Sequence, residues 1–274
     1  MKLVEYRIPM PLTADEYKIG QLYSVADASS NETGGGEGVE VLVNEPFSQT
    51  EGVQPHEPLL AGHENGQYTK KIYHVASKLP LLVRKLAPAG STEILEEAWN
   101  AYPYCRTIVT NPDYMKNSFE IKIETLHVDD DSGKLENVHK LNQEKLISRS
   151  VVNIDIASPP ENKDYKSQTD PTKFKSEKTG RGHLTVGWMN DATVKMCCYK
   201  LVSVKFKWKV IGGKVESLIQ RTEQRIFHNF HRELFCWVDK WHGMTIEDIR
   251  NYEQTTKELL DNKRKKGDVV GTTA

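Results

Sequence analysis

Hydroxyl and ammonium side chains share one face of a short segment that is rich in strand-forming residues. Over 67–75, the side chains of Thr69, Lys71, Tyr73 and Val75 point to the same side of the predicted strand, because strand side chains alternate. A hydroxyl and an ammonium group beside apolar residues are suited to a phosphate or a polyol headgroup. The alternative is a polar strand edge that faces solvent, and these residues alone favour that alternative.

A carboxylate lies on an apolar helix face near the end of the chain. Ile249, Glu253, Thr256 and Leu260 follow one another along one stripe of the last predicted helix. Glu253 is then a carboxylate on an apolar face. The alternative, which these residues alone favour, is a boundary residue that bends out to water.

A sheet and long helices must position these residues. Hydrophobic alternation predicts strands over 2–8, 39–43, 67–75, 119–124 and 198–210, and the segment 94–110 is β-rich. Thr13-x-x-Glu16 is a capping box for a first helix, and Thr245-x-x-Asp248 resembles a cap for a last helix that runs to about 266.

A long helix without proline is predicted over 214–241. Its predicted apolar stripe consists of Val215, Leu218, Ile219, Thr222, Ile226, Phe230, Leu234 and Val238. Hairpin-like strands followed by such a long late helix predict an α+β fold, in which helices cover a sheet.

Composition and charge exclude several classes of protein. The chain has 274 residues, and its 37 Lys+Arg against 38 Asp+Glu argue against a dedicated nucleic-acid-binding protein. No apolar run approaches the roughly 20 residues that a membrane-spanning helix needs. Residues 1–60 carry three basic and ten acidic side chains, whereas residues 195–274 carry sixteen basic and ten acidic ones. The basic end could meet anionic lipid headgroups or could be a solvated surface without a partner.

Signatures of enzymes, metal sites and secretion are missing from the sequence. The glycine cluster at 34–38 does not fit GxGxxG because position 39 is Val, and neither GxxxxGK[ST] nor GxSxG occurs. The amino end has no apolar signal region. The cysteines show neither CxxC nor zinc-ligand spacing, which predicts reduced thiols in the cytosol and no metal site. They are Cys105, Cys197, Cys198 and Cys236.

Longer blocks of sequence carry a family resemblance. The block 31–42 (NETGGGEGVEVL) resembles the class I phosphatidylinositol transfer proteins. Further blocks agree with this family and follow in order: 66–69, 71–74, 98–107 (AWNAYPYCRT), 173–176, 178–182 and 235–237. The resemblance covers nearly the whole chain and implies one domain over 1–274. It implies a START-like α+β fold, in which a concave, mostly antiparallel sheet and long helices enclose a phospholipid cavity.

The same resemblance implies roles for several site residues. Thr69 and Lys71 would contact the inositol phosphate, Asn100 would bond the inositol ring, and Glu253 would accept from ring hydroxyls. A hydroxyl, an ammonium, an amide and a carboxylate can together recognise a polyol that choline cannot mimic. The resemblance also places Cys105 near the choline-lipid site. Phe230 would line the cavity, although an ordinary core position is the alternative.

Membrane contact and regulation are implied for other segments. The segment 80–94 matches a lipid-exchange loop whose apolar residues include Leu82 and Val83. Where the family has a tryptophan pair at a membrane-docking tip, this chain has Trp208 and Lys209, so docking is expected to be weaker.

The segment 159–188 matches the regulatory region of the family, and Ser176 matches its phosphorylatable serine. The last helix and tail span 246–274. The loop 45–65 looks longer than usual for the family and has no assigned role.

The expected function is carriage of one phosphatidylinositol or phosphatidylcholine between membranes, with no bond broken and no cofactor beyond the lipid. We expect a cytoplasmic monomer that associates transiently with membrane surfaces. The alternative is a lipid sensor or adaptor that presents phosphatidylinositol to lipid kinases without net carriage. A lipid-modifying enzyme is a third class, and no nucleophile–base signature supports it.

Overall fold

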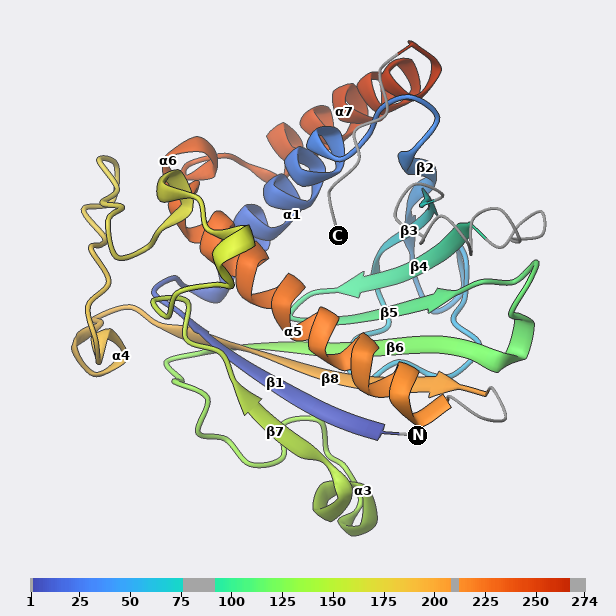
Figure 1. The fold of residues 1–274 in the computed structure, drawn as a ribbon, viewed down its shortest axis with the longest axis horizontal. Helices are drawn as coiled ribbons and strands as arrows, with labels where there is room; N and C mark the ends of the chain where they lie inside the picture. Colours follow the sequence, from blue (N-terminus) through green and yellow to red (C-terminus); the bar gives the residue numbers. More distant parts are fainter. Residues whose placement is uncertain (1, 76–91, 208–211, 267–274) are drawn as a thin grey trace.

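One eight-stranded sheet forms the centre of the molecule. The computed structural model describes residues 2–75, 92–207 and 212–266 (Figure 1). The order of strands in the sheet is β2-β3-β4-β5-β6-β8-β1-β7. The strands are β1 Lys2–Met10, β2 Gly38–Phe47, β3 Gly66–His74, β4 Glu93–Ala101, β5 Tyr104–Thr110, β6 Phe119–Asp129, β7 Ser150–Asn153 and β8 Met196–Phe206. Neighbours pair antiparallel except β1 and β7, which are parallel. The predicted α+β class is confirmed.

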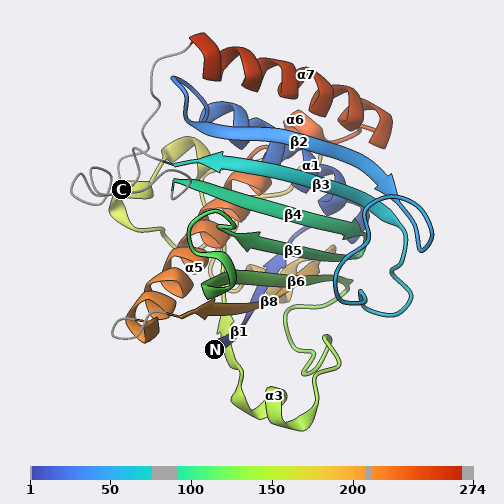
Figure 2. The ribbon, with the colours of Figure 1, turned by 90° about the vertical axis from the view of Figure 1, so that its right-hand side faces the viewer.

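Helices cover one face of this sheet and one of its edges. Figure 1 shows α5 crossing the sheet, and both views place α1 and α7 together beside the β2 edge (Figure 2). The α-helices are α1 Ala14–Asn31, α3 Gln143–Ser148, α4 Trp188–Asp191, α5 Gly212–Cys236, α6 Val238–Trp241 and α7 Ile246–Lys266. Short 3-10 helices lie at Lys116–Ser118, Asn162–Asp164 and Ser167–Thr169.

The face on which α5 packs is called the inner face. Tyr6 of β1 defines it, because its hydroxyl donates to the Gln220 carbonyl at 2.8 Å and its ring meets Phe227 at 5.3 Å. Strand registers then extend the inner face across the sheet, from Lys200 in β8 to Lys71 in β3, since directly paired residues point to the same side.

Both predicted helix starts are confirmed. The Thr13 hydroxyl accepts from the Glu16 amide at 3.1 Å, and the Glu16 carboxylate accepts from the Thr13 amide at 2.9 Å. Thr245 and Asp248 form the same reciprocal pair before α7. Each box satisfies two backbone donors that the first helical turn leaves free.

The prediction for the long helix is wrong at the end of the helix and is only partly confirmed for its apolar stripe. The helix ends at Cys236, and α6 begins at Val238. The predicted stripe packs on the core only in part. Leu234 and Val238 are fully buried and Ile219 and Phe230 pack against the core, whereas Leu218 is 56% exposed and Ile226 is 52% exposed. The Gln220 carbonyl and the Phe227 ring, which lie outside the stripe, also meet the sheet.

The segment 48–65 covers the outer face of β3–β5, which gives this long loop a structural role. The Trp99 indole donates to the Val53 carbonyl at 2.9 Å. Arg106 donates to the carbonyls of Glu57 and Pro58 at 2.7 and 2.9 Å. A small second core of Phe47, Tyr68, Trp99 and Ala101, with Leu59 packed against it, lies below this loop.

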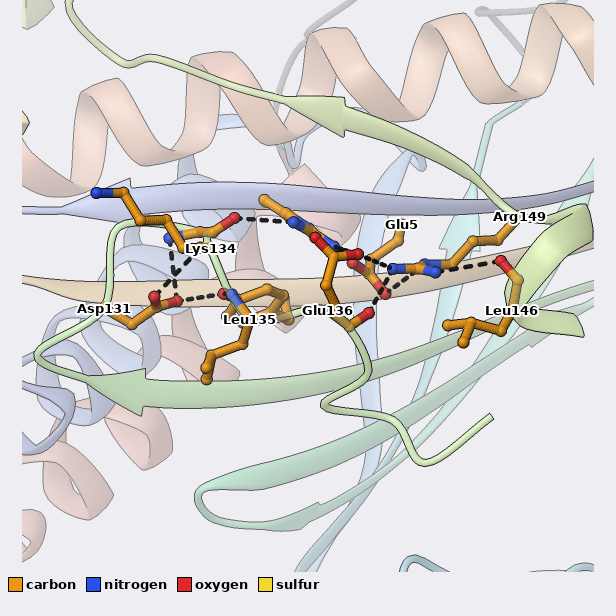
Figure 3. Close-up of polar contacts among 10 residues, drawn as sticks. Glu5, Asp131, Lys134, Leu135, Glu136, Leu146 and Arg149 are labelled. Atoms are coloured by element: carbon orange, nitrogen blue, oxygen red, sulfur yellow. Dashed lines mark hydrogen bonds and ion pairs between the residues drawn. The ribbon is translucent and has the colours of Figure 1, made fainter. Parts of the chain in front are cut away.

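A buried ion cluster joins the segment 130–149 to the outer face of β1 (Figure 3). The Glu5 carboxylate accepts from Arg7 Nε at 2.8 Å and from Arg149 Nε at 3.0 Å. Arg7 also donates to the Gly133 carbonyl at 2.9 Å. Each buried charge is therefore paired within the protein, which offsets its desolvation cost.

The glycine cluster joins the first helix to the last one. The Gly35 amide donates to the Lys263 carbonyl at 3.3 Å, and the Gly36 amide donates to the Arg264 carbonyl at 2.9 Å. Carbonyls of the last turn of a helix have no partner inside that helix. The turn between α1 and β2 therefore caps the end of α7.

Candidate functional site

Lys71 and Thr69 lie on the inner face of β3, as the alternation predicts. Lys71 is paired with Glu96 across β3 and β4, and its Nζ lies 3.2 Å from Glu96 Oε1. The Tyr73 hydroxyl donates to Glu96 Oε2 at 2.9 Å. The Lys71 side chain is only 14% exposed, so this face is not a solvated strand edge.

Asn100 and Cys105 extend the same face into β4 and β5. They are directly paired with each other, and Asn100 is also paired with Gln67 of β3. Asn100 Oδ1 is buried and has no hydrogen-bond partner in the described part of the chain. Burial raises the pKa of the Cys105 thiol to about 11, so this thiol stays protonated at neutral pH.

Glu253 reaches the same end of β3 from α7. Its Oε2 accepts from Asn44 Nδ2 at 3.1 Å and from Arg250 Nη1 at 2.6 Å. Asn44 lies directly opposite Thr69, and its Oδ1 accepts from Gln67 Nε2 at 2.7 Å. The Glu253 side chain is 16% exposed. The four residues predicted to contact the inositol headgroup therefore lie on adjacent elements, and Glu253 does not extend into solvent.

Two polar atoms of α1 point into the same interior. Gln21 Oε1 and Ser24 Oγ are buried and have no hydrogen-bond partner among the described residues. Spacings of four and seven residues place them on the helix face of Tyr17. The Tyr17 ring lies 4.8 Å from the ring of His127, which belongs to the inner face of β6. A buried polar group without a partner is costly, and a ligand would remove that cost.

Lys200 is a cation on the inner face that the sequence analysis missed. It lies in β8 between Thr125 of β6 and Tyr6 of β1. No carboxylate within 2–75, 92–207 and 212–266 forms an ion pair with it. Its charge adds to burial in lowering the pKa of His127 to about 3. The apolar alternation of β8 predicts which strand face is buried, but it gives no signal that a lysine also lies on that face.

An apolar side of α5 adjoins these polar groups. The opposite side of the helix faces the segment 156–170. There, Arg225 binds Asp164, and Arg232 binds the Ile156 carbonyl and Asp170. Phe230 is partly buried and packs against the main core. At 100° per residue, Ile226 and Phe230 lie on the side away from that segment. Phe230 therefore packs against the edge of the main core, on the side of α5 that faces β3–β5.

Ser176 is buried, at 2% exposure. Its hydroxyl donates to Asp239 Oδ1 of α6 at 2.5 Å, and it accepts from the Thr179 amide at 2.9 Å. The predicted phosphorylation stays a prediction, and it requires this loop to leave α6.

Several predicted features lie outside the described residues. These are Leu82 and Val83 of the predicted exchange loop, together with Trp208 and Lys209. Within the described ranges, no helix has the length and apolarity that crossing a membrane requires. The same ranges contain no group of three His, Cys, Asp or Glu side chains placed to hold a metal ion.

Comparison with known proteins identifies the class. The family model described as "Phosphatidylinositol transfer protein" matches residues 1–258. The chain therefore belongs to the phosphatidylinositol transfer protein family, whose fold is START-like.

The relatives place the chain among the class I members of this family. It is 53% identical to the phosphatidylinositol transfer protein beta isoform of Bos taurus over 277 residues, which cover 98% of this chain and 97% of that protein. It is 45% identical to phosphatidylinositol transfer protein 1 of Dictyostelium discoideum over 271 residues, with coverage of 98% and 97%. The solved structure of a Thermus thermophilus protein, TTHA0849, aligns over 86% of this chain and 96% of that one. Its TM-score is 0.36 at 11% identity, which is too low to support any conclusion.

Proposed function

We propose that this chain is a phospholipid carrier that binds one phosphatidylinositol or phosphatidylcholine and exchanges it between membranes. The observation that carries this proposal is a set of incompletely satisfied polar groups in the interior. Asn100 Oδ1, Gln21 Oε1 and Ser24 Oγ have no hydrogen-bond partner among the described residues, and the Lys200 ammonium has no carboxylate partner there. They come from three strands or helices and face one interior. A bound headgroup supplies the hydrogen bonds and the negative charge that they lack.

The inositol headgroup is assigned to the β2–β4 end of the inner face. Thr69 and Lys71 donate to the inositol phosphate, and Asn100 bonds the ring. Glu253, held by Asn44 at 3.1 Å, accepts from ring hydroxyls. Each group left without its partner by a wrong headgroup costs about 1–3 kcal/mol, which is the physical basis of selection.

The inositol phosphate of phosphatidylinositol is also the phosphodiester that both lipids share. Thr69 and Lys71 are assigned to its inositol side, and Lys200 and the neighbouring hydroxyls are assigned to it in both lipids. Thr125 is directly paired with Lys200, and Thr107 lies one strand further along the inner face. Because the Lys200 ammonium has no carboxylate partner among the described residues, it can pair with the single negative charge of the phosphodiester. Charge-assisted hydrogen bonds of this kind are about twice as strong as neutral ones.

The acyl chains require an apolar enclosure. A two-chain phospholipid has roughly 30 methylenes, so exposing them to water would cost on the order of 25 kcal/mol at ~0.8 kcal/mol each. The apolar side of α5 with Ile226 and Phe230 is assigned to this enclosure, and Cys105 is the choline-lipid contact. Transfer between such an interior and a bilayer can then be nearly balanced and reversible.

Contact with the membrane is assigned to the segment 80–94, with Leu82 and Val83, and to Trp208 with Lys209. We propose that the carrier works as a cytoplasmic monomer, without a cofactor and without catalysis. Phosphorylation of Ser176 would put a dianion against Asp239, 2.5 Å from the hydroxyl, and would thereby release the loop from α6.

The test is a vesicle-to-vesicle transfer assay with both lipids labelled. Thr69→Ala and Lys71→Ala should each slow transfer of phosphatidylinositol by about 5- to 150-fold and leave phosphatidylcholine transfer unchanged. Lys70→Ala is the matched control, because Lys70 is the adjacent lysine on the opposite face of β3. Equal loss of both lipids in the Lys71 variant would contradict the headgroup assignment. Lipid binding with slow exchange in the wild type would favour a sensor or adaptor over a carrier.

A further inference from the structure

Glu223 of α5 is a carboxylate in the interior that the assignments above do not use. It lies between Gln220 and Phe227 on the helix, with spacings of three and four residues, so the three share one helix face. That face packs on Tyr6 of β1 through the Gln220 carbonyl and the Phe227 ring. Glu223 therefore points at the inner face of the sheet.

Glu223 lies near both a positive and a negative side chain. The positive charge of Lys200 in β8 lowers its pKa, and the negative charge of Glu96 in β4 raises it. Glu223 in turn raises the pKa of Tyr6 and of Tyr73 in β3. Within the described ranges it forms no hydrogen bond and no ion pair. The charges near Glu223 therefore determine whether its carboxyl group is ionised.

The other titratable groups around Glu223 are protonated tyrosines or have partners of their own. Burial raises the pKa of both tyrosines, Tyr6 and Tyr73, so they stay protonated near neutral pH. Lys71 is paired with Glu96 at 3.2 Å. On α5, Glu216 accepts from the Phe206 amide at 3.3 Å, two turns before Glu223.

The charge balance of the interior depends on the headgroup. Lys71, Lys200 and Glu96 together carry one net positive charge, and the phosphodiester of phosphatidylinositol cancels it. An ionised Glu223 would then be an uncompensated charge at a half-buried position, which is costly. The quaternary ammonium of phosphatidylcholine adds one positive charge, which an ionised Glu223 compensates.

We propose that Glu223 is a specificity-determining residue whose protonation follows the bound lipid, so that replacing phosphatidylcholine by phosphatidylinositol takes up one proton. The proton binds the Glu223 carboxylate and comes from solvent, and no covalent bond of the lipid changes. This inference rests on the proposed function, since it requires that both lipids enter the interior.

The position of Glu223 makes such a response possible near neutral pH. Burial raises the pKa of Glu223 to about 7, while Lys200 opposes the shift and Glu96 adds to it. An added negative charge raises this pKa further, and an added ammonium group lowers it. The two lipid complexes therefore differ in protonation at a pH of about 7.

The experiment measures protons during lipid exchange. Protein loaded with phosphatidylcholine is mixed with excess phosphatidylinositol-containing vesicles in weakly buffered solution with a pH indicator. The wild type should take up about one proton for each lipid replaced at a pH of about 7. Glu223→Gln should exchange lipid without proton uptake, and Glu223→Asp, which still titrates, should retain it. Glu258→Gln, on the exposed side of α7, is the matched control and should behave as the wild type.

Transfer rates give a second measurement. The ratio of inositol-lipid to choline-lipid transfer should rise as the pH falls through about 7 in the wild type, and Glu223→Gln should make this ratio independent of pH. Lipid exchange without proton uptake in the wild type overturns the role of Glu223 and leaves the carrier function intact. Proton uptake that persists in Glu223→Gln overturns it as well. Failure of the wild type to exchange either lipid contradicts the proposed function itself.

Discussion

The two faces of the central sheet differ in how their buried polar groups are satisfied. On the outer face, Glu5 binds two arginines, and Arg106 donates to two carbonyls and to Glu124. On the inner face, Asn100 Oδ1 is buried without a partner, and Lys200 has no carboxylate pair among the described residues. Arg7 Nη2 and Arg106 Nε on the outer face also lack a hydrogen-bond partner among the described residues, but both guanidinium groups are paired with a carboxylate, whereas the Lys200 ammonium of the inner face is not.

This difference separates a structural role from a binding role. A buried cluster whose charges are paired stabilises the position of the loops that cover it, whereas a buried charge without such a pair leaves interaction energy available to a ligand. Substitutions on the outer face should therefore change stability, and substitutions on the inner face should change lipid transfer. Arg7, Lys200 and Asn44 test that division, and His127 tests how strongly burial on the inner face acts on a titratable side chain.

The largest effect is expected on the outer face. Arg7→Met removes one of the two arginines from the buried Glu5 carboxylate and should lower the free energy of unfolding by about 3–5 kcal/mol. Urea denaturation measures this loss. The ratio of the two transferred lipids should stay unchanged, and Lys134→Met, at an exposed site in the covering segment, should have no effect on stability. A changed lipid ratio in Arg7→Met would contradict the division between the faces.

Acid should destabilise the protein through His127. Burial and Lys200 lower the pKa of His127 to about 3, so the ring is neutral in the folded state, whereas the unfolded chain binds a proton near pH 6.5. Its contribution is complete above about pH 6.5 and is lost as the pH falls toward about 3, by about 3 kcal/mol at about pH 4. Unfolding measured across this range should be less steep in pH for His127→Gln, whereas His56→Gln, at an exposed site, should match the wild type. Identical slopes for the wild type and His127→Gln would refute the assignment.

Lys200→Met should weaken the transfer of both lipids, because they share the phosphodiester. The expected loss is about 1.5–3 kcal/mol, or about 10- to 150-fold in affinity. Lipid-free protein should lose no more than about 0.5–2 kcal/mol of its free energy of unfolding, because the substitution removes the cation–π contact of Lys200 with the Phe227 ring at 5.2 Å and no ion pair with a described carboxylate. Lys205→Met is the control on the outer face of the same strand. Loss of only one lipid would place the phosphodiester elsewhere.

The smallest effect is expected at Asn44, which holds the Glu253 carboxylate at 3.1 Å and accepts from Gln67 at 2.7 Å. Asn44→Ala should lower inositol-lipid transfer by about 2- to 10-fold, because it removes the hydrogen bond that positions the Glu253 carboxylate. Choline-lipid transfer should not change. The labelled-lipid assay checks both, and a larger loss of choline lipid would show that Asn44 supports the fold rather than the headgroup.

Local patterns predicted much of the fold. Strand alternation placed Thr69 and Lys71 on one face of β3, and the capping boxes at Thr13 and Thr245 correctly marked the starts of α1 and α7. These features depend on interactions within a few residues, and the sequence displays them directly.

Sequence patterns could not predict features that depend on contacts between segments far apart in the chain. The apolar stripe of α5 was predicted to face the core. Leu234 does so, but Leu218 and Ile226 are exposed, and the polar residue Glu223 shares the helix face of Gln220 and Phe227 that meets the sheet. Hydrophobic periodicity assigns polar residues to the surface, so it fails where the interior itself is polar. Asn44 was missed because only the packing of α7 on β2 brings Glu253 to it.

If the inner face holds a phospholipid, native mass spectrometry of the purified chain should detect it. We expect one chain carrying one phospholipid, with phosphatidylinositol or phosphatidylcholine released on activation and a smaller lipid-bound fraction in Lys200→Met. A folded chain with the mass of the polypeptide alone, in wild type and variant alike, would show that the inner face does not hold a lipid.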